Sequence, residues 1–236
     1  MTVTNRQARG WLRKARSAAA RACGSANDPN WWPKSQGVRT ALSWAVALEW
    51  TRCAGLGHAR SPIWISSCRG KEWETKEKLL QDARYNVSVP SESKHLPYAP
   101  NGARRFDARQ YLVDFSVWPH GSRTTQTDVH LMMESEMCAD YPVGDEVIPN
   151  NGYAYDFYKL IWLPSPRRLF VCTVRDEANR QTLIQSLAKI TTDSIKYLRT
   201  DDLLVYVLPT RSCEAALSKI CVWDHENGRF NESSLG

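Results

Sequence analysis

Apolar and polar positions along the chain follow a helical period in the first third, and a strand period begins after residue 104. The helical part predicts helices over residues 4–23, 38–54 and 71–85. Thr4 or Asn5 is a suitable N-cap for the first of them. A short apolar run predicts a strand over residues 61–67, whereas the Pro- and Ser-containing segment 87–101 has no period and predicts a loop.

After residue 104 the pattern changes, and apolar and polar side chains alternate in segments that predict strands. Two such segments, 109–119 and 128–137, flank a turn at 121–125 and therefore predict an antiparallel hairpin. The second of them has an apolar side and a polar side, and the polar side carries Glu134 and Glu136. Beyond the hairpin, the pattern predicts a helix over 153–163, a strand over 167–174, a helix over 175–193 and a strand over 202–209.

This order of elements predicts one main α/β domain with additions at both ends. We expect a basic N-terminal helix with a Trp-containing linker over residues 1–34, the α/β domain over 35–215, and a polar C-terminal tail over 216–236. The chain of 236 residues is long enough for a single sizeable core. The pattern contains neither an internal repeat nor a low-complexity segment.

Composition excludes several classes of protein. No apolar run approaches 18 residues, so no transmembrane helix is expected, and the N-terminus lacks the apolar core of a secretory signal. The seven cysteines include no C-x-x-C pair, which favours reduced thiols in the cytoplasm over zinc sites or disulfides. The sequence has no P-loop, no G-x-G-x-x-G and no G-x-S-x-G motif.

The net charge of +6 is concentrated at the N-terminus. Residues 1–22 contain six basic side chains and no acidic one, and the rest of the chain is balanced. A basic arm on a neutral body suits an anionic partner, most simply DNA, and the expected contacts are Arg9, Arg13, Lys14 and Arg16. Two other interpretations stay open, namely a solvated surface helix and, ranked last, an organellar transit peptide.

Four polar side chains between residues 114 and 159 are candidates for chemistry. Asp114 stands in an apolar strand, where an ionised carboxylate requires a partner or a cation. Glu134 and Glu136 share one side of the next strand, and Lys159 lies on the following helix. Two or three carboxylates with one ammonium are what metal-dependent phosphodiester cleavage requires. The simpler interpretation places both glutamates on a solvent-facing edge strand, and the helical wheel leaves the exposure of Lys159 open.

These residues resemble the PD-(D/E)xK restriction-endonuclease-like superfamily. An Asp on one strand is followed by E-S-E on the next, by the helix segment Y-D-F-Y-K-L, and then by a Val- and Phe-containing strand. The family has Lys where this chain has Glu136, so the similarity is to the variant whose lysine has moved to the helix, here Lys159. The chain also departs from the family in having Val113, and not Pro, before Asp114.

The resemblance implies an αβββαβ core with a mixed central sheet flanked by helices, to which this chain adds the basic N-terminal helix. It implies Mg²⁺- or Mn²⁺-dependent hydrolysis of DNA phosphodiesters in restriction, repair or defence. Asp114 and Glu134 would bind the metal, and Glu49 would be an additional ligand or would support the ligands from behind. Glu136 would be a third catalytic acid or would hold the metal-bound water, and Lys159 would orient the nucleophile. Arg104, Arg105 and Arg109 are expected to contact the DNA.

Two interpretations from other classes remain. One is a non-catalytic DNA-binding or assembly protein on the same fold, and the other is a protein–protein module that uses exposed tryptophans, of which the chain has ten. No membrane partner is expected, and a homodimer is compatible with the sequence. The recognised DNA sequence, the strandedness of the substrate and the pathway do not follow from it.

Overall fold

The computed structural model describes residues 3–25, 36–58, 60–61, 63–67, 73–81, 87–88, 113–119, 129–137, 152–163, 165–194, 202–209 and 218–234. The helices in these ranges are α1 (Asn5–Ala22), α2 (Gln36–Cys53), α3 (Trp73–Leu80), α5 (Gly152–Trp162) and α6 (Glu177–Asp193). The strands are β1 (Ile63–Ser67), β2 (Val87–Ser88), β3 (Phe115–Pro119), β4 (Leu131–Glu136), β5 (Arg167–Val174), β6 (Asp202–Pro209), β7 (Lys219–Asp224) and β8 (Arg229–Ser234).

The described strands form one mixed, open sheet in the order β2-β1-β3-β4-β5-β6-β7-β8. β1 runs parallel to the short strand β2 and antiparallel to β3, and β3 runs antiparallel to β4. β4, β5 and β6 run parallel to one another. At the far end, β6, β7 and β8 are again antiparallel. The parallel connections β4–α5–β5 and β5–α6–β6 need a helix each, because a parallel neighbour is reached only by a crossover.

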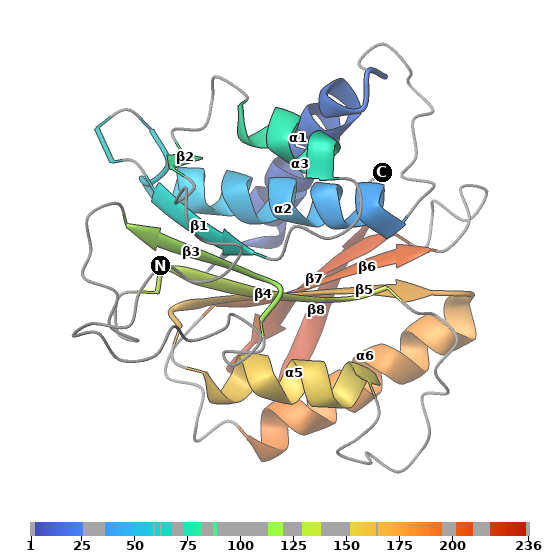
Figure 1. Ribbon diagram of the computed structural model, residues 1–236. Coiled ribbons are helices and arrows are strands. Elements are labelled where there is room, and N and C mark those ends of the chain that lie inside the picture. Colours follow the sequence, from blue (N-terminus) through green and yellow to red (C-terminus); the bar gives the residue numbers. More distant parts are fainter. Residues whose placement is uncertain are drawn as a thin grey trace.

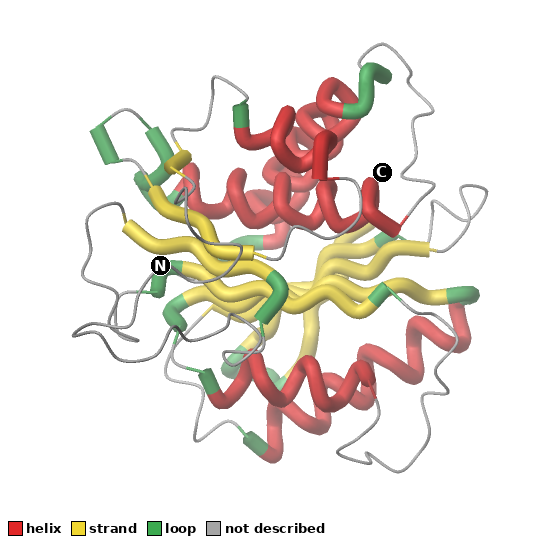
Figure 2. Tube along the Cα trace, in the orientation of Figure 1, coloured by secondary structure: helices red, strands yellow, loops and turns green. Residues whose placement is uncertain are grey.

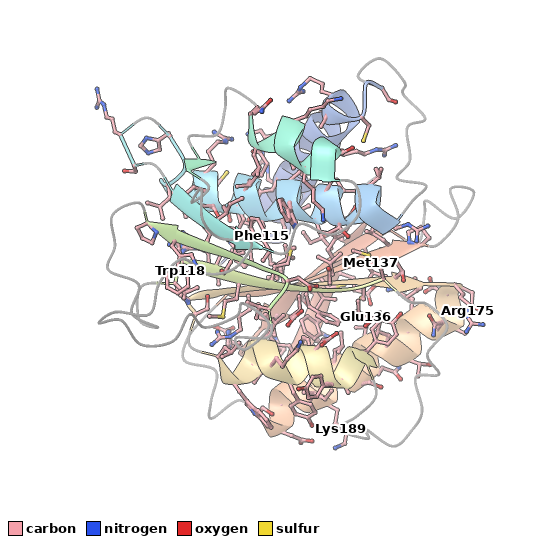
Figure 3. The ribbon with its side chains drawn as sticks, in the orientation of Figure 1. Phe115, Trp118, Glu136, Met137, Arg175 and Lys189 are labelled. Atoms are coloured by element: carbon pink, nitrogen blue, oxygen red, sulfur yellow. The ribbon has the colours of Figure 1, made fainter. Side chains whose placement is uncertain are left out.

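Helices cover both faces of the sheet, with α1, α2 and α3 on one side and α5 and α6 on the other (Figures 1 and 2). Strand alternation divides the core between these layers. Phe115 faces α2, where its ring centroid lies 4.9 Å from that of Trp44 (Figure 3). Phe170 faces α5, where its ring meets Phe157 edge-on at 5.2 Å. Two buried clusters, one on each face, therefore hold the three layers together.

The structure confirms the α/β class, with a mixed sheet flanked by helices, and the antiparallel hairpin of β3 and β4. It also confirms Thr4 as the N-cap of α1, because Thr4 and Gln7 form a reciprocal capping box. The predicted linker after the first helix and most of the predicted loop lie outside the described residues, since β2 is all that is described of 87–101.

The C-terminal segment differs from the sequence-based expectation. The pattern predicts a polar tail over 216–236, but β7 and β8 extend the sheet there. In β7, Ile220 and Val222 pack toward the α2 side while Cys221 and Trp223 pack toward the α6 side. A short strand buried on both faces shows little alternation, so its pattern does not stand out from the polar residues around it.

The sequence predicts no membrane-spanning helix. Among the described residues, no helix is both long and apolar enough to cross a lipid bilayer.

The N-terminus of α6 offers a test of local stability. Asp176 caps this helix, and its Oδ1 accepts a hydrogen bond from the backbone N–H of Asn179 at 2.7 Å. We expect Asp176→Ala to lower the free energy of unfolding by about 1 kcal/mol, because the N–H loses its acceptor and the helix dipole loses a favourable charge. Urea unfolding followed by circular dichroism measures this, and an unchanged midpoint would contradict it.

Candidate functional site

The strand pair β3–β4 brings Asp114 and Glu134 together. Phe115 pairs with Met133 in the antiparallel register, so the next step of the ladder sets Asp114 opposite Glu134. By alternation Glu134 points to the same face as Met132, toward α5. Its side chain is only 2% exposed. The solvent-facing interpretation of Glu134 is therefore wrong, and the carboxyl is a buried polar group that needs partners.

Lys159 supplies one partner for Glu134 from α5. Its Nζ lies 2.7 Å from Glu134 Oε1 and 2.7 Å from Asp156 Oδ1. The lysine side chain is 15% exposed, which settles the question left open by the helical wheel. Its Nζ also lies 5.3 Å from the ring centroid of Tyr155, a cation–π contact on the outer side of the helix. The ammonium is thus enclosed by two carboxyls and an aromatic ring.

The electrostatics of this pair are dominated by burial. Burial and the nearby charge of Asp114 raise the pKa of Glu134 to about 9, and the opposing effect of Lys159 is smaller. Burial lowers the pKa of Lys159, but the charges and hydrogen bonds of Glu134 and Asp156 outweigh it and raise that pKa above its ordinary value. The strand pair therefore holds two crowded carboxyls beside a lysine that stays charged.

Asp114 is held at β4 by Ser135, the residue between the two glutamates. Its Oδ2 accepts a hydrogen bond from the Ser135 backbone N–H at 2.8 Å and another from the Ser135 hydroxyl at 2.7 Å. Two such bonds fix the direction of the carboxylate at the start of β3. Asp114 is half-buried. Ser135 is the kind of partner that the sequence argument required for a carboxylate in an apolar strand.

The other two predicted acids have different surroundings. Glu136 ends β4 half-buried, in register with Cys172 of β5, and Figure 3 labels both it and its neighbour Met137. Burial, and more weakly the charge of Glu136, raise the pKa of the Cys172 thiol. Glu49 is fully buried on α2, which covers the opposite face from α5, and its Oε2 lies 3.2 Å from Arg52 Nη2.

The structure thus brings together Asp114, Glu134 and Lys159, whereas Glu49 belongs to the other helical layer. In the part of the chain that is described, no three His, Cys, Asp or Glu side chains are grouped in a way that could hold a metal ion. The metal site stays a prediction with Asp114 and Glu134 as its core.

The predicted DNA contacts are only partly described. Arg9, Arg13 and Lys14 are exposed on α1 and Arg16 is half-buried there. Arg104, Arg105 and Arg109 lie outside the described residues.

Sequence reasoning missed Asp156, although its position three residues before Lys159 on a helix is a detectable signal for an ion pair. It also missed Ser135, whose role as a double donor to Asp114 depends on the strand register. His130 is paired with a residue of β5. One of its ring nitrogens lies 2.9 Å from Arg167 Nη1 and accepts a hydrogen bond from it. Burial and the charge of Arg167 lower the pKa of His130 to about 4, so the ring is neutral.

Two contacts to β5 fix α5, and with it Lys159. At the start of the helix, the Tyr153 hydroxyl donates to the Thr173 carbonyl at 2.7 Å. At its end, the buried Arg168 side chain donates from Nε to the Leu160 carbonyl at 2.6 Å and from Nη2 to the Leu163 carbonyl at 2.9 Å. These donors occupy carbonyls that a helix C-terminus leaves without partners.

Comparison with known proteins adds no family to this description, because the chain matches no protein-family model, no curated protein and no solved structure.

Proposed function

We propose that this protein hydrolyses DNA phosphodiesters with the help of a divalent metal ion, on a restriction-endonuclease-like core. The observation that carries this proposal is the convergence of Asp114, Glu134 and Lys159 at β3, β4 and α5, with Lys159 Nζ 2.7 Å from Glu134 Oε1. The sequence resemblance assigned ligand roles to the first two and the nucleophile-orienting role to the third, although they are separated by up to 45 positions.

The element order supports the same proposal. From α2 onward, a helix precedes three antiparallel strands in the order β1, β3, β4, and α5 then leads to β5, parallel to β4. With α3 and β2 taken as insertions after β1, this element order agrees with the αβββαβ core that the resemblance implies. The strands beyond β5 and the helix α1 are additions to that core.

The donor set fits a hard divalent cation. Asp114 and Glu134 offer carboxylate oxygens, which Mg²⁺ and Mn²⁺ prefer. Their mutual repulsion contributes to the raised pKa of Glu134, and positive charge between them would relieve it. Glu136 lies one pleat further along the same side but is not grouped with Asp114 and Glu134 as a third ligand, so water and phosphate oxygens would fill the remaining positions around the cation. When bound there, the metal would polarise the scissile phosphate and activate water.

The chain's own residues would position and neutralise the substrate. Lys159 would place its charge beside the phosphate as negative charge develops on it. Asp156 would keep that ammonium paired and oriented when Glu134 turns toward a cation. Ser135 would keep Asp114 aimed across the strand pair, since both of its donors bind one oxygen of that carboxylate.

A cleavage assay tests the proposal. Wild-type protein is incubated with supercoiled plasmid and with single-stranded DNA in Mg²⁺, Mn²⁺ or EDTA, in parallel with Glu134→Gln. We expect metal-dependent cleavage that falls at least about 100-fold in the variant, the scale of losing a group that stabilises the transition state. Glu226→Gln, which changes an exposed acid in the turn after β7, is the matched control and should cleave like wild type.

Equal cleavage by wild type and Glu134→Gln, or cleavage that persists in EDTA, would refute the proposal. A second candidate is a non-catalytic DNA-binding protein. The network of Glu134, Lys159 and Asp156 favours it, because with the Glu134 carboxyl protonated the ammonium of Lys159 and the carboxylate of Asp156 already balance in charge. Salt-sensitive DNA binding, together with calorimetry that detects no Mn²⁺ binding, would establish that candidate.

A further inference from the structure

The outer side of α1 is strongly basic. Its exposed charged side chains recur at intervals that keep them on one side of the helix, and they comprise Arg6, Arg9, Arg13, Lys14 and Arg21. Arg16 is half-buried on the same helix, and the sequence of α1 contains no acid. This stripe spans most of an 18-residue helix.

The inner side of α1 is occupied by the body of the protein. Ala8, Leu12 and Ala15 are fully buried, and Trp11 stacks on Trp50 of α2 with ring centroids 5.8 Å apart. A helix that binds a membrane surface needs a free apolar face to insert among the lipids. Because that face is used in the core, a partner meets only the guanidinium and ammonium groups, which suits a chain of phosphates.

The two helical layers differ in charge. In α1 and α2 the basic side chains are accompanied by one acid, Glu49, which is fully buried and paired with Arg52. In α5 and α6 the charges balance, since Lys159, Arg180 and Lys189 are matched by Asp156, Glu177 and Asp193. A polyanion is therefore attracted to the α1 layer more strongly than to the described helices of the other layer.

The basic stripe of α1 lies on one side of the sheet. The acid–lysine cluster, which consists of Asp114, Glu134 and Lys159, lies on the other. α1 contacts α2, α3, β7 and β8, whereas Glu134 and Lys159 meet between β4 and α5 (Figure 1). Three strand steps separate β4 from β7, about 14 Å, and a helical layer stands about 10 Å from each face. A DNA duplex is stiff over about 150 base pairs, so one turn of it cannot lie along α1 and also reach Glu134.

We propose that α1 is a second nucleic-acid contact, which binds phosphates of a segment other than the one presented to Asp114, Glu134 and Lys159. The presence of DNA at the acid–lysine cluster is taken from the proposed function, and this part of the inference rests on it. A long, flexible single strand can pass around the sheet and occupy both contacts, and it gains affinity from the second as an intramolecular event, whereas a short, stiff duplex occupies only one at a time.

The test variant is the triple substitution Arg9→Gln, Arg13→Gln and Lys14→Gln, since glutamine keeps a high helix propensity. The control triple, Arg175→Gln, Lys189→Gln and Arg229→Gln, removes equal charge from exposed residues elsewhere, and Figure 3 shows Arg175 and Lys189 on the α6 side. Binding to a 60-nucleotide single strand (the 60-mer) and to a 12-base-pair duplex (the 12-mer) is measured over a salt series, together with Mn²⁺-dependent cleavage of the 12-mer.

For the α1 triple we expect the affinity for the 60-mer to fall at least about tenfold, and the slope of log affinity against log salt to decrease by about 2 to 3. Cleavage of the 12-mer should persist and fall less than binding of the 60-mer, because the short duplex gains no affinity from occupying both contacts. Equal losses in both triples, loss of 12-mer cleavage with the α1 triple, or no binding of wild type to the 60-mer would overturn the inference.

Two further outcomes separate the proposals from one another. Wild type that binds the 60-mer through α1 but cleaves nothing refutes the nuclease proposal and leaves the α1 contact in place. Sedimentation with phosphatidylserine vesicles identifies the other anionic partner: if the α1 triple loses vesicle binding but keeps DNA binding, α1 is a membrane contact and the inference is wrong.

Discussion

Glu134→Gln should become progressively more stable than wild type as the pH rises from about 5 to about 8. The folded-state pKa of Glu134 is raised to about 9, because the carboxyl is buried and lies near the charge of Asp114. In the unfolded chain the same group ionises near its ordinary pKa. The folded wild type therefore holds a proton that the unfolded chain releases, and wild-type stability declines as pH rises through this window.

The decline amounts to at most about 1.4 kcal/mol per pH unit, since one proton is involved. Glutamine mimics the neutral carboxyl and does not titrate, so the difference between variant and wild type should reach at least about 2 kcal/mol at pH 8. Urea unfolding at pH 5, 6, 7 and 8 in EDTA measures it, with Glu226→Gln as the control for an exposed acid. Parallel curves for Glu134→Gln and wild type would show that Glu134 is ionised throughout.

Arg168→Met should lower the free energy of unfolding by about 2 to 4 kcal/mol. Arg168 is 2% exposed, and its guanidinium donates to the carbonyls of Leu160 and Leu163 at the end of α5. Methionine keeps much of the side-chain volume but offers no donor, so the carbonyls lose charge-assisted bonds, each worth about 1 to 3 kcal/mol when its partner is left buried.

Chemical denaturation measures this loss, and Arg175→Met, at an exposed position, should change stability by less than about 0.5 kcal/mol. The variant also tests the position of Lys159, because Arg168 fixes the end of the helix that carries it. If the variant is as stable as wild type, the Arg168 bonds do not contribute net stability and another contact holds α5.

The two predictions describe opposite contributions to stability at one site. Arg168 stabilises α5, whereas the buried carboxyl of Glu134 costs stability that increases with pH. Strongly shifted pKa values are enriched at functional sites, so the raised pKa of Glu134 agrees with the metal-binding role proposed for this residue. With the same Glu134→Gln variant, the cleavage assay tests the proposed function of Glu134, and the stability series tests how much stability its carboxyl costs the fold.

Local pattern in the sequence was sufficient for most elements of the fold. Alternation predicted β3 and β4 and their hairpin, and the prolines after Leu163 predicted the end of α5. β7 was missed, because a strand covered on both faces lacks the alternation that marks a half-buried one. β8 was missed because Phe230 is its only large apolar residue, and its other residues are polar. The helices were predicted within a few residues in most cases, since apolar periodicity is a local property of the chain.

The sequence by itself determined which residue types were available for chemistry: Asp114, Glu134, Glu136 and Lys159, with a basic helix at the start of the chain. Only the tertiary structure decided that Glu134 is buried, that Lys159 reaches it together with Asp156, and that Glu49 lies in the other helical layer. The physical reason is that strand register and the packing of α5 on β5 place side chains that are far apart in the sequence, and neither is encoded in a local period.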